Sequence, residues 1–351
     1  MSHAEHRISN EVHISVVIST YNRCETLPAA IESILKQNDR ELNYELIVVD
    51  NNSTDNTRSV VESFISQGHR HVRYVFEPKK GASHGRNAGI AHAQGAIIAF
   101  TDDDVLPGTD WLRSIKLAFD SNPDVECVGG KILPLWKTEP PAWLTTDHWG
   151  PLAIADYGDS VILSDPGTPI CWSTSNLSFR AQVFDRIGGF SGEFLRSQDR
   201  ELMCRFISDD RQMLYVPNSV VTTEVPPERL TKAYHRRWHQ TSGKYHALMH
   251  LYERMGPNGQ IRKEPMETVR LFGVTGFLYR EFMKECGRWL VATLRRQESL
   301  SFKHENRVRY WFAYMRESYQ RDLALRKGTR VAEVLRFVKA MLHKRTHSIS
   351  N

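Results

Sequence analysis

Three consecutive carboxylates, Asp102, Asp103 and Asp104, lie one residue after the apolar run Ile97–Phe100. Uncompensated, they repel one another, and a hard divalent cation held by carboxylate oxygens removes that repulsion. The same cation, Mn²⁺ or Mg²⁺, can neutralise a diphosphate leaving group. A solvated acidic turn, or a cap for a helix that begins at Trp111, would use the same residue types. The position at the carboxyl end of an apolar run favours the metal site.

Two earlier apolar runs end in clusters of hydrogen-bonding side chains. Tyr21 follows the first run, and Asp50 follows the second. A nucleoside needs a flat apolar face for its base, an acceptor for the base's imide hydrogen and donors for the ribose hydroxyls, and these two residues could meet part of that need. Asn, Ser, Thr and Asp after a strand also form turns and helix caps. On this pattern alone both interpretations stay open.

The elements that must position these side chains alternate between strand and helix. Helical periodicity covers Glu25–Gln37 and Asp55–Gln67. Four apolar, β-branched runs predict buried parallel strands: Val12–Ser19, Tyr44–Val49, Val72–Phe76 and Ala96–Phe100. This alternation predicts a doubly wound α/β sheet, in which ligands bind beyond the carboxyl ends of the strands.

The pattern loosens after the acidic triplet. We expect a loop, with a possible role as a lid, over Leu133–Ile170, which is rich in Pro, Trp and Gly. A helix is expected to start at Ser197 or Gln198, and the chain reads as almost wholly helical from Leu230 onward. The remaining predictions are a helix over Trp111–Phe119 and strands over Val125–Ile132, Asn176–Arg180 and Met213–Val221.

Charge divides the 351-residue chain into an acidic and a basic part. Residues 1–229 hold 21 Lys and Arg against 31 Asp and Glu, whereas residues 230–351 hold 25 against 10. We therefore expect one domain over residues 1–228 and a basic, mainly helical region over 229–351. The five cysteines are scattered singly, and no run reaches the roughly 18 apolar residues of a membrane span. These features predict a cytoplasmic protein.

Five sequence segments resemble the family 2 glycosyltransferases of the GT-A fold in order and spacing: SVVISTYNR, LIVVDNNSTDNT, GASHGRNAGIAHAQGAIIAFTDDDV, SNLSFRAQVFDRIGGF and SQDRELMCR. The match covers residues 12–228. The resemblance implies a mixed nucleotide-diphospho-sugar transferase sheet flanked by helices. By that resemblance, Asp102 and Asp104 form the metal-binding Asp-x-Asp motif, with Asp104 the direct ligand and Asp102 the bridge to the ribose. The donor-binding residues that it implies are Thr20, Tyr21, Asn22, Asp50, Arg86, Asn87, Asp102 and Asn176.

Two positions depart from the family pattern. The resemblance makes Asp199 the catalytic base, but the family's preceding Glu is replaced by Gln198. A first-turn carboxylate is also an ordinary helix cap. Many relatives carry a metal-binding His near residues 220–227, where this chain has none. Either Glu224 or water would take that place, or the acidic triplet holds the metal alone.

The function implied is inverting transfer of a sugar from a UDP- or GDP-sugar to a hydroxyl on a saccharide or lipid-linked acceptor, in surface polysaccharide or glycolipid assembly. A nucleotidyltransferase would need a glycine-rich phosphate loop, for which Gly81–Gly89 is the only candidate and lacks the required pattern. A non-catalytic nucleotide-sugar binding protein is a further alternative. We expect no nucleic-acid partner, because the chain shows no recognisable nucleic-acid motif.

The composition of the basic region suggests that it binds a membrane surface. Its apolar and basic residues alternate within single turns, and each cation near an anionic leaflet contributes about 1 kcal/mol. The apolar residues concerned are Phe272, Phe277, Leu278, Phe282, Trp289 and Leu290. A second apolar stripe, over residues 331–342, is by itself more typical of a helix that packs on its own domain. We hypothesise peripheral attachment to the anionic inner face of the membrane.

Overall fold

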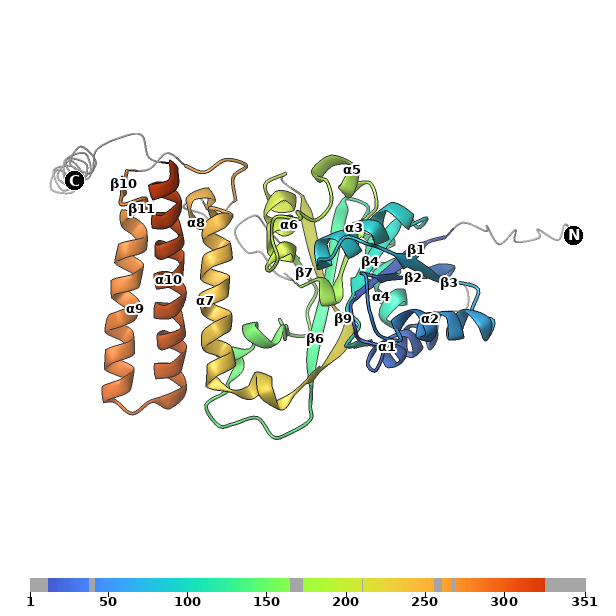
Figure 1. The fold of residues 1–351 in the computed structure, drawn as a ribbon, viewed down its shortest axis with the longest axis horizontal. Coiled ribbons are helices and arrows are strands. Elements are labelled where there is room, and N and C mark those ends of the chain that lie inside the picture. Colours follow the sequence, from blue (N-terminus) through green and yellow to red (C-terminus); the bar gives the residue numbers. More distant parts are fainter. Residues whose placement is uncertain are drawn as a thin grey trace, which may run out of the picture. The chain divides into compact units, whose positions relative to one another are not determined.

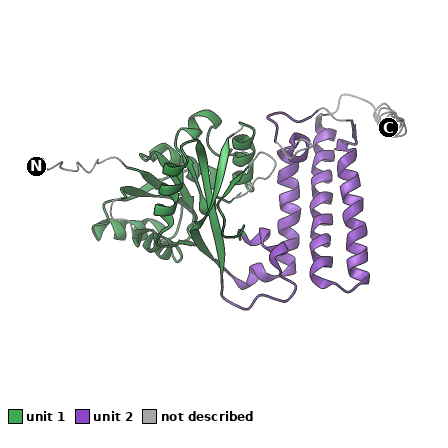
Figure 2. Cartoon of the chain, turned by 180° about the vertical axis from the view of Figure 1, so that it is seen from behind, with its two compact units in different colours: residues 1–135, 153–224 green, residues 136–152, 225–351 purple. Residues whose placement is uncertain are grey.

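The computed structural model describes residues 12–37, 42–164, 173–209, 211–255, 261–266 and 269–325. Contacts divide the chain into two compact units (Figure 2). Unit 1 comprises residues 1–135 and 153–224, and unit 2 comprises residues 136–152 and 225–351. The division falls close to the predicted domain boundary, but it also assigns residues 136–152 to the helical unit.

The first half of unit 1 is the predicted alternation of parallel strands and helices (Figure 1). Its strands pair in the order β3-β2-β1-β4, all parallel. The strands are β1 (Ile14–Thr20), β2 (Tyr44–Asp50), β3 (Val72–Phe76) and β4 (Ile97–Thr101), and the helices are α1 (Leu27–Leu35), α2 (Thr57–Ser66) and α3 (Ala82–His92). The carboxyl ends of β1 and β2 therefore lie side by side.

The second half of unit 1 continues the sheet with antiparallel pairing, which makes the nine-stranded sheet mixed as predicted. Beyond β4 the order is β8-β6-β9-β5, and β7 pairs with β9. The strands are β5 (Val105–Pro107), β6 (Val125–Trp136), β7 (Ile162–Ser164), β8 (Leu177–Arg180) and β9 (Gln212–Val225). The helices are α4 (Trp111–Ser121), α5 (Val183–Ile187) and α6 (Gln198–Ile207), and η3 (Thr174–Asn176) is a 3₁₀ turn.

Both faces of the parallel strands are buried, which explains why their sequences read as unbroken apolar runs. On β2, Leu46 and Val48 pack into the main core, together with residues of α1, α2 and α4. The alternate residues, Ile47 and Val49, pack against Ala88 of α3 on the opposite face. Helices on both faces leave the strand ends as the place where polar side chains can gather.

Residues 81–89 form the start of helix α3 and not a phosphate-binding loop. Two glycines let this helix approach β1 closely, because a Cβ at Gly85 would lie 2.0 Å from the Ser19 hydroxyl oxygen and one at Gly89 would lie 2.3 Å from a Val17 methyl. The glycines serve helix–strand packing. Residues 81–89 therefore have a packing role in the fold.

The predicted loop over residues 133–170 is mostly packed where the structure describes it. Strand β6 continues to Trp136, and Ala155 forms a bridge with Ile132. Trp143 and Leu152 are buried. These contacts do not support a lid in the described part, and residues 165–170 lie outside it.

The described part of unit 2 contains three long helices, with α10 (Glu298–Leu325) packed against both α7 (Lys232–Leu248) and α9 (Gly276–Leu294) (Figure 1). Its core includes Leu278, Trp311 and Tyr314. The shorter elements are η1 (Thr146–His148), η2 (Gly150–Leu152), η4 (Pro227–Leu230), α8 (Leu251–Arg254), β10 (Arg270–Leu271) and β11 (Val274–Thr275). No helix in the described part of the chain is long and apolar enough to cross a membrane.

The basic residues of unit 2 are partly neutralised within it. Glu285 is fully buried between α9 and α10, and its carboxylate accepts from Arg288, His304 and Arg307 at 2.8, 2.6 and 2.9 Å. A buried charge is stable only when it is paired, and these three partners supply that pairing. Part of the basic excess therefore stabilises the helical packing.

A group of buried aromatic and histidine rings joins η1 to α7 and α10. His235 is fully buried, and its ring lies 5.1 Å from that of Trp143. Burial, reinforced by the neighbouring His148, lowers the pKa of His235 to about 4. The pKa of His239 is also lowered, to about 3, by burial and by the neighbouring His235 and His148.

We expect acid to destabilise unit 2 through His235. Its pKa is lowered on folding, so its stabilising contribution is complete above the unfolded pKa of about 6.5 and is lost as the pH falls towards 4. The full loss is about 3 kcal/mol. His235→Phe should therefore lose less stability than the wild type between pH 7 and pH 4 in urea unfolding. The exposed His92, changed to Phe, is the control, and equal losses in wild type and His235→Phe would contradict the prediction.

Candidate active site

The candidate site begins where β1 and β2 end. Thr20 and Asp50 are paired in register, and both side chains are buried. The Asp50 carboxylate accepts from the Ser53 amide and from the Tyr74 hydroxyl, each at 2.8 Å. Burial and Asp50 together raise the pKa of Tyr74 to about 12, so Tyr74 stays a donor. Asp50 is thereby held in a fixed orientation at the strand end.

Hydrogen bonds of Asn22 connect the segments that follow β1 and β2. Its side-chain oxygen accepts from the Thr54 backbone amide at 2.7 Å, and its backbone amide donates to the Ser53 hydroxyl at 2.9 Å. Asn22 and Asn52 both adopt left-handed backbone conformations, with φ of 51° and 64°. Asparagine tolerates this region better than most residues. The contacts of Asn22 therefore fix the shape of the predicted nucleoside site.

Tyr21 presents the aromatic surface that the sequence predicts. Its side chain is 44% exposed, and its hydroxyl accepts from the Lys80 ammonium at 2.9 Å. The same ammonium lies 4.8 Å from the centre of the ring. An exposed ring with a cation beside it can stack on a base while the cation faces phosphate.

The acidic triplet is divided by the structure into two outward carboxylates and one buried one. Asp102 accepts from Arg86 at 3.0 Å and from the Ser175 hydroxyl at 2.6 Å, and Asp104 pairs with Arg23 at 3.5 Å. Asp103 is buried between them, and burial raises its pKa to about 6. The arrangement leaves Asp102 and Asp104 as the two carboxylates that can meet a ligand.

These two carboxylates fit a hard divalent cation as partial ligands. Among the residues that the structure describes, no group of three His, Cys, Asp or Glu side chains could hold a metal. Val105 of β5 pairs with Thr223 of β9, so Asp104 and Glu224 each lie one residue beyond that pair. Mn²⁺ and Mg²⁺ commonly retain waters and bind phosphate oxygens, so an incomplete protein shell suits them.

Arg86 interacts with both the acidic motif and the predicted base. One guanidinium nitrogen binds Asp102, while the other terminal nitrogen is buried without a hydrogen-bond partner. The guanidinium also lies over the ring of Phe190, 5.6 Å from its centre. The positive charge of Arg86 acts on Asp199 and opposes the rise in its pKa. Arg86 thus joins the donor-binding and catalytic parts of the site electrostatically.

Asp199 stands in the first turn of α6. Its carboxylate accepts from the Arg200 amide at 2.8 Å, and burial raises its pKa above the usual value despite Arg86 and Arg200. The helix follows Ser197, a non-glycine residue at φ 58°. Backbone strain of this kind often accompanies a functional position. A raised pKa makes Asp199 a stronger proton acceptor than an ordinary aspartate.

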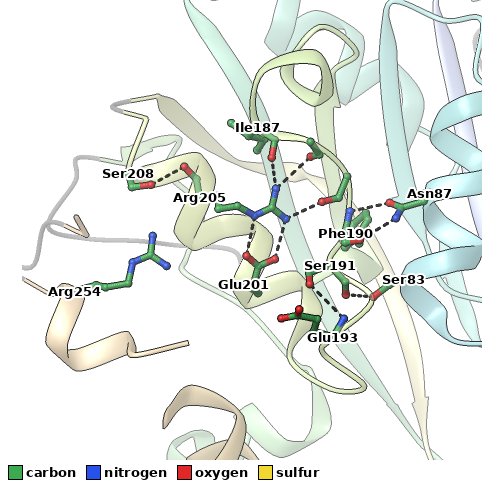
Figure 3. Close-up of polar contacts among 12 residues, drawn as sticks. Ser83, Asn87, Ile187, Phe190, Ser191, Glu193, Glu201, Arg205, Ser208 and Arg254 are labelled. Carbon is green, nitrogen blue, oxygen red and sulfur yellow. Dashed lines mark hydrogen bonds and ion pairs between the residues drawn. The ribbon is translucent and has the colours of Figure 1, made fainter. Parts of the chain in front are cut away.

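Glu201, the other carboxylate in the first turn of α6, is paired with Arg205. The two side chains form a bidentate ion pair, in which two guanidinium nitrogens of Arg205 each donate to one carboxylate oxygen of Glu201 at 2.8 Å (Figure 3). The same guanidinium donates to the carbonyls of Ile187 and Gly189. Glu201 therefore anchors an arginine and is not available as a base.

The loop between α5 and α6 is fastened to α3 as well as to Arg205. The Asn87 amide forms two hydrogen bonds with the Phe190 backbone, at 2.7 and 2.8 Å, and the Ser83 hydroxyl donates to the Ser191 carbonyl at 2.8 Å (Figure 3). The contacts of Asn87 are therefore with the protein backbone. Since α3 carries Arg86 and α6 carries Asp199, this loop sets the relative position of the two.

We expect Arg205→Met to lower the free energy of unfolding by about 3 kcal/mol, because it leaves a largely buried Glu201 and two carbonyls unpaired. Arg58→Met is the matched control, since it breaks an exposed helix pair with Glu62 that contributes less than about 0.5 kcal/mol. Urea unfolding followed by circular dichroism measures both. Equal effects of the two substitutions would contradict the role given to Arg205.

Asn176 does not have the place that the resemblance implies. Its amide nitrogen donates to the carbonyls of Lys131 and Ser219, and its oxygen accepts from the Trp111 indole and the Ser219 hydroxyl. These four bonds use the full capacity of a carboxamide. The residue is buried, so we correct the expectation of a donor-sugar contact: Asn176 links β6, β9 and α4.

Four residues that the sequence left without a role contact the predicted site residues. They are Arg23, Tyr74, Lys80 and Ser175. Tyr74 could have been found from strand order, because β3 pairs with β2 and places it opposite Val48. No local signal marks Ser175, which reaches Asp102 through the antiparallel pairing of β8 with β4.

Comparison with known proteins gives two family matches. The model of glycosyl transferase family 2 matches residues 15–149, and that of glycosyl transferase family group 2 matches residues 97–297. A glucosyl-dolichyl phosphate glucuronosyltransferase from Haloferax volcanii is 27% identical over 191 residues, which are 54% of this chain and 59% of that protein. A validoxylamine A glucosyltransferase from Streptomyces hygroscopicus is 28% identical, over 52% of this chain and 47% of that one. The chain thus spans about half the length of these curated relatives.

Solved structures share the fold at low identity. The mannosyltransferase PcManGT from Pyrobaculum calidifontis, in complex with GDP-Man and Mn²⁺, has a TM-score of 0.52 at 17% identity, over 97% of this chain and 84% of that one. Residues 1–349 of S. aureus TarS, in complex with UDP-GlcNAc, have a TM-score of 0.54 at 16% identity, over 88% and 92%. The unit 1 sheet is accordingly the GT-A fold. Since the family group 2 model covers more than half of the chain, the protein belongs to the family 2 glycosyltransferases.

Proposed function

We propose that the protein is an inverting glycosyltransferase that moves a sugar from a nucleoside-diphosphate sugar to an acceptor hydroxyl. The observation that carries this proposal is the Arg86 guanidinium, which binds the Asp102 carboxylate at 3.0 Å and acts electrostatically on Asp199. A donor-binding carboxylate and a carboxylate of raised pKa in one site match the two ends of a displacement reaction.

At the acceptor end, Asp199 would remove the proton from the hydroxyl as its oxygen attacks the anomeric carbon. The bond to the diphosphate breaks on the opposite side, and the nucleoside diphosphate leaves with the bonding electron pair. The raised pKa of Asp199 brings its basicity nearer to that of neutral solution. Positioning of the two reactants would supply much of the remaining rate enhancement.

At the donor end, Tyr21 would stack on the base, and Thr20 and Asp50 would bind the nucleoside. The site holds more carboxylates than cations, so a diphosphate would be repelled without further positive charge. Bound at Asp102 and Asp104, Mn²⁺ or Mg²⁺ would offset the charge of the leaving diphosphate. The Mn²⁺ in the PcManGT complex supports this assignment.

The relatives support a class of substrates. Solved neighbours bind GDP-Man and UDP-GlcNAc, which favours a GDP- or UDP-sugar donor. One curated relative is named for a glucosyl-dolichyl phosphate, which favours a saccharide or lipid-linked acceptor. We place the enzyme in the assembly of surface polysaccharide or glycolipid, in the cytoplasm at the inner face of the cell membrane.

A panel of UDP- and GDP-sugars, incubated with Mn²⁺ or Mg²⁺ and followed by release of nucleoside diphosphate, tests the proposal. We expect slow hydrolysis of at least one donor without acceptor, and faster release when a suitable acceptor is present. Pyrophosphate release from a nucleoside triphosphate and a sugar phosphate would instead establish the nucleotidyltransferase alternative. Binding of donors with no turnover under any condition would establish the non-catalytic alternative.

A further inference from the structure

Helix α9 has two opposite faces of different character. Leu278, Glu285 and Ala292, spaced by seven residues, are buried against the rest of unit 2. On the opposite side of the helix, Leu290 and Leu294 are 61% and 76% exposed. A helix packed on one side normally turns polar side chains outward, so an apolar outer face calls for an explanation.

The outer face extends over several turns. Met283 is 65% exposed and begins the stripe, which continues through Gly287 to Leu290 and Leu294 at helical spacing. A Cβ built at Gly287 meets nothing within 4 Å. Within the described residues, therefore, this stretch of α9 faces open space.

The structure also revises which residues of the basic region can reach a surface. Leu278 and Phe282, which the sequence pattern included, pack in the core of unit 2. Phe277, Trp289 and Leu290 are exposed. The second predicted stripe, over residues 331–342, lies outside the described residues.

Basic side chains flank the apolar stripe. Residues 276–297 contain five Lys and Arg against two Glu, a net charge of +3. The basic residues are Arg280, Lys284, Arg288, Arg295 and Arg296. Arg288 pairs with the buried Glu285, and Lys284 and Arg280 lie 2.9 and 3.4 Å from Glu281, so this segment keeps an excess of positive charge after its acids are paired. Exposed apolar residues beside cations match a surface whose outer layer is anionic and whose interior is apolar.

We propose that the outer face of α9 binds the anionic surface of a lipid bilayer, with Met283, Leu290 and Leu294 entering the interface. The charge selects this occupant, because two copies of a face with this charge would repel each other. The stripe is also short and stays in the interface, since no described helix can span a membrane. The inference rests on the proposed membrane location and does not require the transfer reaction.

Sedimentation of the full-length protein with vesicles tests the proposal. We expect binding to vesicles of equal parts phosphatidylglycerol and phosphatidylcholine at low salt, weaker binding at high salt, and little binding to phosphatidylcholine alone. Arg295→Gln with Arg296→Gln should weaken binding by about fivefold for each charge removed. No binding to the anionic vesicles at low salt would overturn the proposal.

Substitutions on the stripe test the apolar contribution. Leu290→Gln with Leu294→Gln should weaken vesicle binding by about tenfold. Leu117→Gln, on an exposed position of α4, is the matched control and should leave it unchanged. Gly287→Leu should tighten binding by about threefold, a gain that misfolding cannot produce.

Three further measurements distinguish other occupants of this face. If light scattering gives the Leu290 and Leu294 variant a different molecular mass from the wild type, the face is an interface between copies of the chain. That result would overturn the proposal. A clear fall in its thermal unfolding midpoint would show that the chain itself covers the face, with the same consequence. Nucleotide-sugar hydrolysis in solution should be unchanged in these variants. If the wild-type protein hydrolyses no nucleotide sugar, that result would contradict the proposed transfer reaction but not the proposed membrane binding.

Discussion

Asp199→Asn is expected to lower the rate of sugar transfer by roughly a hundredfold or more while leaving donor binding unchanged. The asparagine keeps the size of the side chain but cannot accept the acceptor's proton, and a general base contributes on that scale. Donor binding should persist because the proposed nucleoside and diphosphate contacts are at the ends of β1, β2 and β4. Single-turnover transfer and calorimetric binding of the nucleoside diphosphate measure the two quantities separately.

The pH dependence provides a second readout for Asp199. Burial raises its pKa, and a base works only when ionised, so kcat/KM should fall as the pH drops through that raised value. The variant should lack this acidic limb. Asp185→Asn, in the first turn of α5, is the matched control. It should retain the wild-type rate of sugar transfer and the fall of kcat/KM at acidic pH. Unchanged transfer by Asp199→Asn would assign the base to another residue.

Asp104→Ala is expected to abolish turnover that depends on Mn²⁺ or Mg²⁺. The substitution removes one of only two outward carboxylates at the acidic motif, so the charge of the leaving diphosphate would no longer be offset. Asp104 is a cleaner target than Asp102, whose carboxylate also holds Arg86 and Ser175 and whose loss would disturb the site more widely. Turnover across a titration of the metal measures the effect.

Two comparisons make the test of Asp104 specific. Asp110→Ala, at the exposed start of α4, changes another acid nearby in the sequence and should leave turnover unaltered. Wild-type enzyme in excess chelator should resemble Asp104→Ala. Full wild-type activity in chelator would show that transfer needs no metal and would remove the assigned role of both carboxylates.

The parallel half of the sheet could be predicted closely from the sequence because its signal is local. Runs such as Tyr44–Val49 are apolar on both faces, and amphipathic helices separate them, so strand and helix differ in period. Helix α3 escaped prediction because its glycines imitate a loop. Their reason lies in the side chains of Ser19 and Val17 on β1, which the local sequence of residues 81–89 does not contain.

The sequence by itself determined the family and the chemical types at the site: a carboxylate triplet after β4, polar tips on β1 and β2, and an acid at the start of α6. Only the tertiary structure decided which of these side chains meet. Strand pairing and burial turned Asp103 inward, saturated the amide of Asn176 and let Arg205 occupy Glu201. Local sequence records the chemical character of a side chain, whereas its availability depends on partners distant along the chain.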